Sequence, residues 1–183
     1  NPIVNSGPDS MIGHGIPSPN IHIAEGHVFH IDIGVVRDGY ASDLQRSWYV
    51  GHGPPEDVMR AFTVVRGAIT AGAEALKVGA QGWQVDDAAR RFMVDHGYPE
   101  YMHALGHQVG RMAHDGGAVL GPRWERYGRT PYIPVSENEV YTLELGVMVE
   151  GRGYLGIEEM VCVRDGELEW LSTRQETLPS IAI

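Results

Sequence analysis

The feature that most constrains this sequence is a set of acidic residues placed inside apolar stretches. Four acids have Ile or Leu as a direct neighbour in segments typical of buried strands: Asp32, Asp43, Glu144 and Glu158. A carboxylate inside an apolar strand costs free energy unless a cation, a metal ion or hydrogen-bond donors accompany it. Several such groups close together also repel one another and raise each other's pKa. The chain is therefore expected to fold so that these acids share compensating partners.

Two of these acids are expected in one β-hairpin. Residues 28–36 are rich in Val, Ile and Phe and predict a strand, and residues 40–50 predict a second one. An Asp-Gly pair between them is typical of a tight turn, because it tolerates positive φ. Such a hairpin places Asp32 beside Asp43. Two interpretations remain open here: a metal site, or two carboxylates satisfied by backbone donors or by Arg46.

Histidines gather in the second half of the chain. His103 and His107 share a glycine-rich segment, and His114 follows closely. Imidazole is a common metal ligand, and an oxygen-rich site with one imidazole suits Mn, Fe, Co or Zn. Bridging carboxylates would allow two ions to lie about 3.5–4 Å apart. The alternative is that these histidines are ordinary core or surface residues.

The remaining pattern predicts an α+β fold. Helices are expected at residues 55–79 and about 84–95, strands at residues 140–145, 154–163 and 167–171, and an irregular segment at residues 115–134. We expect the helices to cover one face of a curved antiparallel sheet. Strand alternation places Glu159 on the solvent side, opposite Glu158. Cys162 lies in an apolar run and is expected to be buried.

Composition and charge exclude several classes of function. The 183 residues fit one domain, and the formal net charge of −10 argues against nucleic-acid partners and anionic membranes. The apolar runs fall short of the ~20 residues that a membrane helix needs. No secretory leader is visible, and the single cysteine favours a cytoplasmic protein. Because Asn1 follows no initiator Met or helix, we interpret residues 1–183 as a catalytic domain that is incomplete at its N-terminus.

The ordered acids and histidine resemble the ligand set of the pita-bread metallopeptidases, which include methionine aminopeptidases, prolidases and Xaa-Pro aminopeptidases. The family order Asp, Asp, His, Glu, Glu is matched by Asp32, Asp43, His107, Glu144 and Glu158. Residues 42–46 resemble the family's Ser-Asp-x-Thr-Arg, and residues 103–110 resemble its His-x-x-Gly-His-x-x-Gly. The resemblance implies the pita-bread fold and two divalent metal ions. Mn is the expected metal, with Co, Zn or Fe as alternatives.

The motifs point to different branches of this family. The short interval between Glu144 and Glu158 resembles that of prolidases and Xaa-Pro aminopeptidases, which act on peptides with proline in the second position. Residues 14–17, His-Gly-Ile-Pro, resemble methionine aminopeptidases instead. Three residues depart from the family pattern: Leu145 replaces Pro, Gly156 replaces Arg and Glu159 replaces Asp. The alternatives are a methionine-aminopeptidase-like enzyme and a non-catalytic module that binds peptides.

The resemblance also implies roles for individual residues. Asp43 and Glu158 would bridge the metals, and Glu144 would carry a proton as well as bind metal. His114 would stabilise the oxyanion, His103 would contact the substrate backbone, and His14 would line the pocket on the leaving side. Asp32 would also bind the free amino terminus. The implied partners are short peptides and a second copy in a homodimer, formed through this domain or one upstream.

Overall fold

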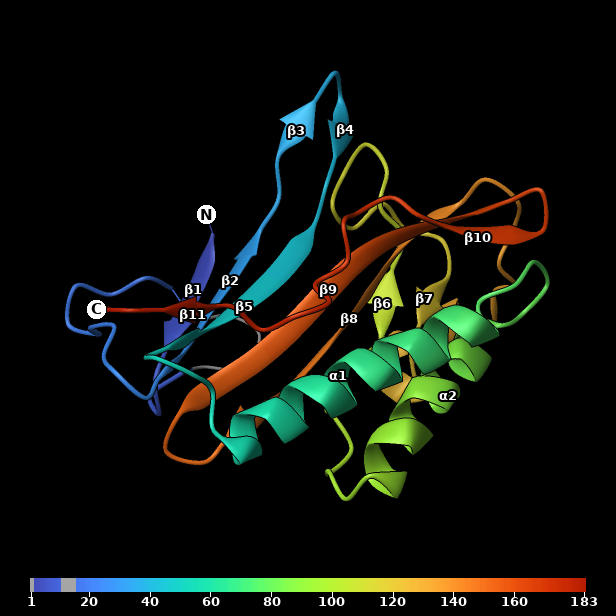
Figure 1. The fold of residues 1–183 in the computed structure, drawn as a ribbon. Helices are drawn as coiled ribbons and strands as arrows, with labels where there is room; N and C mark the ends of the chain where they lie inside the picture. Colours follow the sequence, from blue (N-terminus) through green and yellow to red (C-terminus); the bar gives the residue numbers. More distant parts are fainter. Residues whose placement is uncertain (1, 11–15) are drawn as a thin grey trace.

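The computed structural model describes residues 2–10 and 16–183 (Figure 1). One sheet has the order β1-β2-β5-β11, with bounds Ile3–Ser6, Val28–Ile33, Leu44–Val50 and Ser180–Ile181. The other has the order β10-β9-β8, with bounds Glu167–Trp170, Gly153–Arg164 and Val140–Val149. Two short pairs are β3 with β4 (Val36–Arg37, Tyr40–Ala41) and β6 with β7 (Gly106–His107, Val119–Leu120). The helices are α1 (Glu56–Ala75), α2 (Gly82–Asp95) and the short 3-10 turns η1 (Glu125–Tyr127) and η2 (Thr130–Tyr132).

The two larger sheets meet along β5 and β9, which run side by side (Figure 1). The fully buried Ser47 hydroxyl donates to the Gly156 carbonyl at 2.8 Å and accepts from the Gly156 N–H at 3.1 Å. Arg46 donates to the carbonyl of Glu158 at 2.7 Å. Pairing is antiparallel in both sheets except at β11, which is parallel to β5. The seam brings the acids of the first sheet to those of the second.

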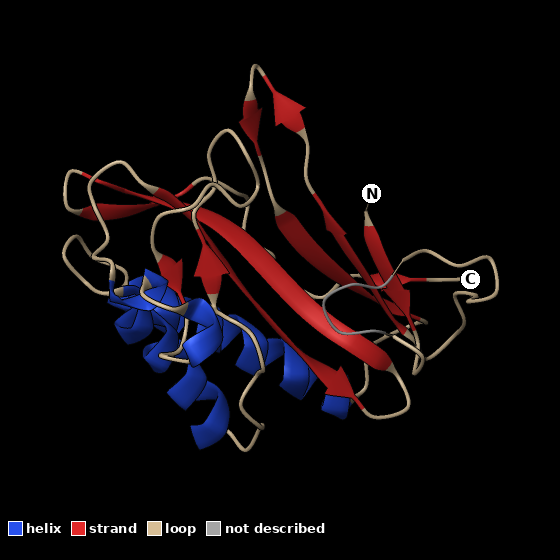
Figure 2. Cartoon of the chain, turned by 180° about the vertical axis from the view of Figure 1, so that it is seen from behind, coloured by secondary structure: helices blue, strands red, loops and turns tan. Residues whose placement is uncertain are grey.

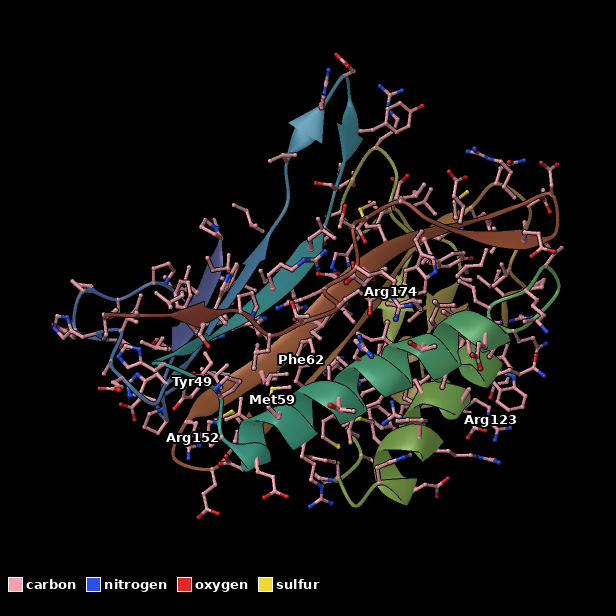
Figure 3. The ribbon with its side chains drawn as sticks, in the orientation of Figure 1. Tyr49, Met59, Phe62, Arg123, Arg152 and Arg174 are labelled. Atoms are coloured by element: carbon pink, nitrogen blue, oxygen red, sulfur yellow. The ribbon has the colours of Figure 1, made fainter. Side chains whose placement is uncertain are left out.

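Both helices cover the same face of the sheets, as predicted (Figure 2). Helix α1 lies along β8 and β9, and its apolar stripe is buried against them. Phe62 of α1 is 3% exposed and belongs to the same core as Tyr49 of β5, whereas Met59 remains partly exposed (Figure 3). The core therefore lies between α1 and the sheets. The predicted α+β architecture is confirmed.

The ends of the helices differ from the expected ones for local reasons. Helix α1 ends before Gly79 because Leu76 has an extended backbone, and its N–H bonds the carbonyl of Gly72. Helix α2 begins at Gly82, directly after Gln81, whose backbone is extended and whose N–H donates to the side-chain oxygen of Gln84 at 2.8 Å. Both helices nevertheless contain the apolar residues that predicted them.

The predicted strand over residues 40–50 is wrong in one respect that matters. Ser42 and Asp43 form no strand, and they separate β4 from β5. The Ser42 carbonyl comes so close to Gly34 that a Cβ there would lie 2.0 Å from it. Only glycine allows this approach of two backbones. Asp43 thus follows a break in the hairpin, beside the end of β2.

The predicted solvent exposure of Glu159 is also wrong. Glu159 is 2% exposed, and its carboxylate pairs with Arg46 at 3.0 Å. The same carboxylate accepts hydrogen bonds from the Ser172 hydroxyl at 2.5 Å and the Gln175 N–H at 2.8 Å. Alternation does place it opposite Glu158, but the segment after β10 covers that face. The predicted burial of Cys162 is confirmed.

The far end of the sheet is tied to the first turn of α1. Arg152 lies in the turn between β8 and β9 and pairs with Asp57 at 2.7 Å (Figure 3). An acid in the first turn also suits the positive end of the helix dipole. Among the helices of the described residues, none has the length and apolar character needed to cross a bilayer.

Candidate metal centre

The five predicted ligands converge from separate elements. Asp32 lies near the end of β2, Asp43 just before β5, His107 on β6, Glu144 on β8 and Glu158 on β9. Their donor atoms form overlapping groups of three within 4.8 Å, namely Asp32, Asp43 and Glu158, and then His107, Glu144 and Glu158. Glu158 belongs to both groups, so it lies at the centre of the set.

Strand register explains why two glutamates face each other. In the β8–β9 pair, Glu144 is the direct partner of Glu158. Like charges at directly opposite positions destabilise a sheet. Glu158 is 1% exposed, and within the described part of the chain neither of its carboxylate oxygens has a hydrogen-bond partner. A buried carboxylate of this kind is costly unless a cation compensates it. The donor set therefore fits divalent metal ions.

The His107 ring is oriented toward the acids. Its Nδ1 lies 3.2 Å from the carbonyl oxygen of Gln108, to which its N–H donates a hydrogen bond. Its Nε2 lies 3.5 Å from Glu144 Oε1 and 3.9 Å from Asp43 Oδ2. A backbone acceptor on one nitrogen commonly fixes the tautomer of a metal-binding histidine. The Nε2 lone pair is thus directed into the site.

Electrostatics in the metal-free site favour neutral groups. Burial, followed by the charges of Asp32 and Asp43, raises the pKa of Glu144 to about 8. Burial and then Asp43 raise the pKa of Asp32 to about 6, and burial also raises the pKa of Asp43. The pKa of Glu158 is raised well above its usual range by burial and then by Glu144. Burial lowers the pKa of His107 to about 4. Bound cations would reverse the cost of ionising these acids.

A cavity of about 1030 Å³ opens over these residues and extends to Tyr98 and Met148. His103 and His114 line it, as their predicted substrate roles require. The His114 ring stacks on His107, with centroids 3.8 Å apart and planes inclined by 15°. His14, the fourth catalytic candidate, lies outside the described residues.

A polar row beside the acids was not predicted from the sequence. His30 and Gln45 lie on β2 and β5, are 2% and 6% exposed, and also line the cavity. The Gln45 amide donates to Glu144 Oε2 at 2.8 Å. The Tyr154 ring meets His30 edge-on, with centroids 5.0 Å apart. A polar side chain at an inward strand position was the available signal for both residues.

A buried ion pair beneath the histidine segment was also missed. Asp86 and Arg90 of α2 are paired at 2.7 Å and are 1% and 7% exposed. Arg90 also donates to the carbonyls of Tyr101 and His103, and Asp86 accepts the Leu105 N–H at 3.1 Å. The pair thus holds the backbone that leads into His107. The pair was not predicted because its spacing of four residues on a helix is the same as that of an ordinary surface ion pair.

A buried group of acids with one imidazole, open to a cavity, fits the donor set of a site for divalent metal ions. The chain belongs to the metallopeptidase family M24, whose family model matches residues 1–165. The resemblance inferred from the ligand order is therefore confirmed.

Relatives with reported names point to one branch of this family. The chain is 29% identical over 177 residues to an Xaa-Pro dipeptidase of Pyrococcus furiosus, covering 96% of this chain and 48% of that protein. An Xaa-Pro dipeptidase of Pyrococcus horikoshii is also 29% identical, over 178 residues, with coverage of 96% and 48%. The solved X-Pro aminopeptidase of Thermotoga maritima superposes with a TM-score of 0.86 at 30% identity, covering 98% of this chain and 49% of that one. The predicted fold is confirmed, and the chain spans about half the length of these relatives.

Proposed function

We propose that this chain forms the catalytic part of an Xaa-Pro peptidase, an aminopeptidase or dipeptidase that depends on two divalent metal ions. The observation that supports it most is Glu158, which is buried without a hydrogen-bond partner among the described residues and lies between two groups of ligand atoms. Relatives named for Xaa-Pro cleavage support the substrate class. Mn is the proposed metal, because oxygen-rich donor sets with an imidazole suit it.

The chain offers enough donors to hold two ions. Asp32 and Asp43 would serve one ion, and His107 and Glu144 the other, with Asp43 and Glu158 shared between them. Glu158 belongs to both ligand groups, which supports a bridging role for it, and Asp43 is the proposed second bridge. When bound, the ions would polarise the scissile carbonyl and lower the pKa of an attacking water.

Residues around the ions would move protons and hold the peptide. Glu144, with its raised pKa, is the proposed proton carrier. His114 is exposed above His107 and would donate a hydrogen bond to the developing oxyanion. His103 would contact the peptide backbone from the cavity wall. Asp32 would also bind the free amino terminus, which confines cleavage to the end of a peptide.

We also propose that the protein acts in the cytoplasm as a homodimer on short peptides. Light scattering of the purified protein tests the dimer: a mass of one chain at working concentration would contradict it. Cell fractionation tests the location.

The substrate class is tested by assaying full-length protein loaded with Mn²⁺ on Met-Pro and Met-Ala peptides. We expect Met-Pro peptides to be cleaved and Met-Ala peptides to be cleaved slowly or not at all. The Glu144→Gln variant is the control for a contaminating peptidase, because it removes the proposed proton carrier. Preference for Met-Ala would instead favour a methionine-aminopeptidase-like enzyme. Two bound ions without hydrolysis of either peptide would favour a binding module.

A further inference from the structure

A row of hydrogen bonds leads from β1 to the candidate metal centre. Asn5 Nδ2 lies 3.4 Å from His30 Nδ1, and His30 Nε2 lies 3.0 Å from Gln45 Oε1. Gln45 Nε2 then lies 2.8 Å from Glu144 Oε2. Asn5 is 4% exposed, and His30 and Gln45 are similarly buried. Three neighbouring strands thus contribute to one buried row that ends on a candidate ligand.

The chemistry of the groups gives this row a single direction. An ionised Glu144 only accepts hydrogen bonds, so the Gln45 amide must turn its NH₂ toward it. The Gln45 oxygen then accepts, and His30 must carry its proton on Nε2. His30 Nδ1 is left as an acceptor for the Asn5 amide. Every donor in the row therefore points toward Glu144. The arrangement requires a neutral His30, which suits a ring that is only 2% exposed.

Strand β9 leaves room for this row by having glycine at residue 156. A Cβ on Gly156 would lie 2.7 Å from Gln45 Oε1 and 2.9 Å from His30 Nε2. It would also lie 2.6 Å from Cε1 of Tyr154. These distances are shorter than real Cβ contacts, so a larger residue at position 156 would require Gln45, His30 and Tyr154 to shift. The side chains of His30 and Gln45 thus pass close to Gly156, where a Cβ would meet them.

The hydrogen bond from Gln45 occupies one oxygen of Glu144 and leaves the other facing the candidate ligands. Oε2 accepts the Gln45 amide at 2.8 Å, while Oε1 lies 3.5 Å from His107 Nε2 among the candidate ligands. A hydrogen bond on one oxygen fixes the rotation of a carboxylate and directs the other oxygen. We propose that Gln45 and His30 are positioning residues, which hold Glu144 so that one oxygen faces the metal ions. This inference rests on the proposed function.

The first test is the Gln45→Met variant, which keeps the length of the side chain but removes both amide contacts. Mn²⁺ binding is measured by isothermal titration calorimetry, and kcat and KM are measured on a Met-Pro peptide. We expect about 10–100-fold weaker binding of at least one ion and a similar loss of kcat, with little change in KM. Gln175→Met is the matched control, because among the described residues the Gln175 amide bonds backbone groups of Ser47 on β5 and of Thr177, and neither is a candidate ligand. It should leave Mn²⁺ affinity within about twofold, within normal mutational scatter.

The second test asks whether His30 acts through Gln45. His30→Leu removes the donor that orients the amide, so it should weaken Mn²⁺ binding less than Gln45→Met does. In the double variant the loss should equal that of Gln45→Met alone, because a residue that acts through another adds nothing once that one is gone. A structural role would instead give losses that multiply, together with a lower melting temperature of the metal-free protein.

The outcomes separate this inference from the proposed function. If the parent protein binds no Mn²⁺, the proposed function is wrong and the positioning role falls with it. If the parent binds two ions and Gln45→Met binds both equally tightly, the positioning role alone is wrong. If the losses of Mn²⁺ affinity in His30→Leu and Gln45→Met multiply fully in the double variant, His30 does not act through Gln45 and the row does not work as a unit.

Discussion

Individual buried carboxylates in this protein differ in their effect on stability, because they contact different groups. Glu158 and Glu159 are neighbours on β9 and are equally buried, at 1% and 2% exposure. Glu159 meets Arg46 and the Ser172 hydroxyl, so its charge is compensated within the chain. Glu158 meets other acids, which with burial raise its pKa. The same residue type therefore stabilises the fold at one position and costs stability at the next, unless metal is bound.

This contrast predicts opposite effects of one substitution at the two positions. In metal-free protein at pH 8, Glu158→Gln should melt at the same temperature as the parent or higher, because it removes a buried acid whose ionised form has no compensating partner. It should also weaken Mn²⁺ binding. Glu159→Gln should lower stability by roughly 1–3 kcal/mol, because hydrogen bonds to a charged group are lost. Thermal melts with and without Mn²⁺ measure both effects. A Glu158→Gln variant less stable than Glu159→Gln would contradict this account.

The oxyanion role gives a second prediction for a single residue. His114→Ala should lower kcat on a Met-Pro peptide by about 10²–10³, the usual loss for one oxyanion donor. His96→Ala is the matched control, because His96 also stacks on a ring, that of Phe92, with centroids 4.0 Å apart, but lies at the end of α2. Steady-state kinetics on both variants decide the matter. Near-normal kcat for His114→Ala would show that the role is wrongly assigned.

At the scale of elements, α2 supports the site although it contributes no ligand. Its buried Arg90 holds the carbonyls of Tyr101 and His103, and its Asp86 holds the N–H of Leu105. The segment before β6 has few backbone bonds of its own in the described structure. Helix α2 thus fixes the path of the chain into His107.

Breaking the Asp86–Arg90 pair should lower the free energy of unfolding, because it leaves the buried charge of Asp86 uncompensated. Arg90→Met is expected to lose about 3–5 kcal/mol of unfolding free energy and to weaken Mn²⁺ binding. Arg91→Met is the control: Arg91 forms the same type of pair with Asp87 at 2.9 Å, but on an exposed surface. Its loss should be below about 1 kcal/mol. Urea unfolding measures both, and equal losses would refute the supporting role.

The whole molecule shows which parts of the structure a sequence can predict. The four acidic ligands were identifiable because each has Ile or Leu beside it in an apolar segment, and His107 because the ligand order resembles that of a known family. Helix α1 was identifiable because its apolar stripe repeats with the helical period. The seam between β5 and β9, the cover over Glu159 and the buried Arg90 were not predicted. Each depends on contacts between segments far apart in the chain, such as Arg46 with Glu159. Local patterns give the direction of a side chain, but the element that meets it is set by the fold.

The metal-free protein should lose stability as pH rises from about 6.5 to 8. The pKa of Glu144 is raised from 4.5 to about 8, so the stability it contributes is complete below 4.5 and is lost as pH rises toward 8. Glu158, also raised, acts in the same direction. His30 and His107, each lowered to about 4, act oppositely, but mainly below pH 6.5. Saturating Mn²⁺ should reverse the trend, because metal binds deprotonated acids. Melting temperatures across this range check the sign, and a rise with pH without metal would contradict it.

The central claim is that five residues from five separate segments hold two metal ions. Anomalous diffraction from crystals of the protein grown with Mn²⁺ tests it most directly. We expect two peaks roughly 3.5–4 Å apart, both in contact with the set Asp32, Asp43, His107, Glu144 and Glu158. Manganese elsewhere, or none at these residues in protein that cleaves Met-Pro peptides, would contradict it.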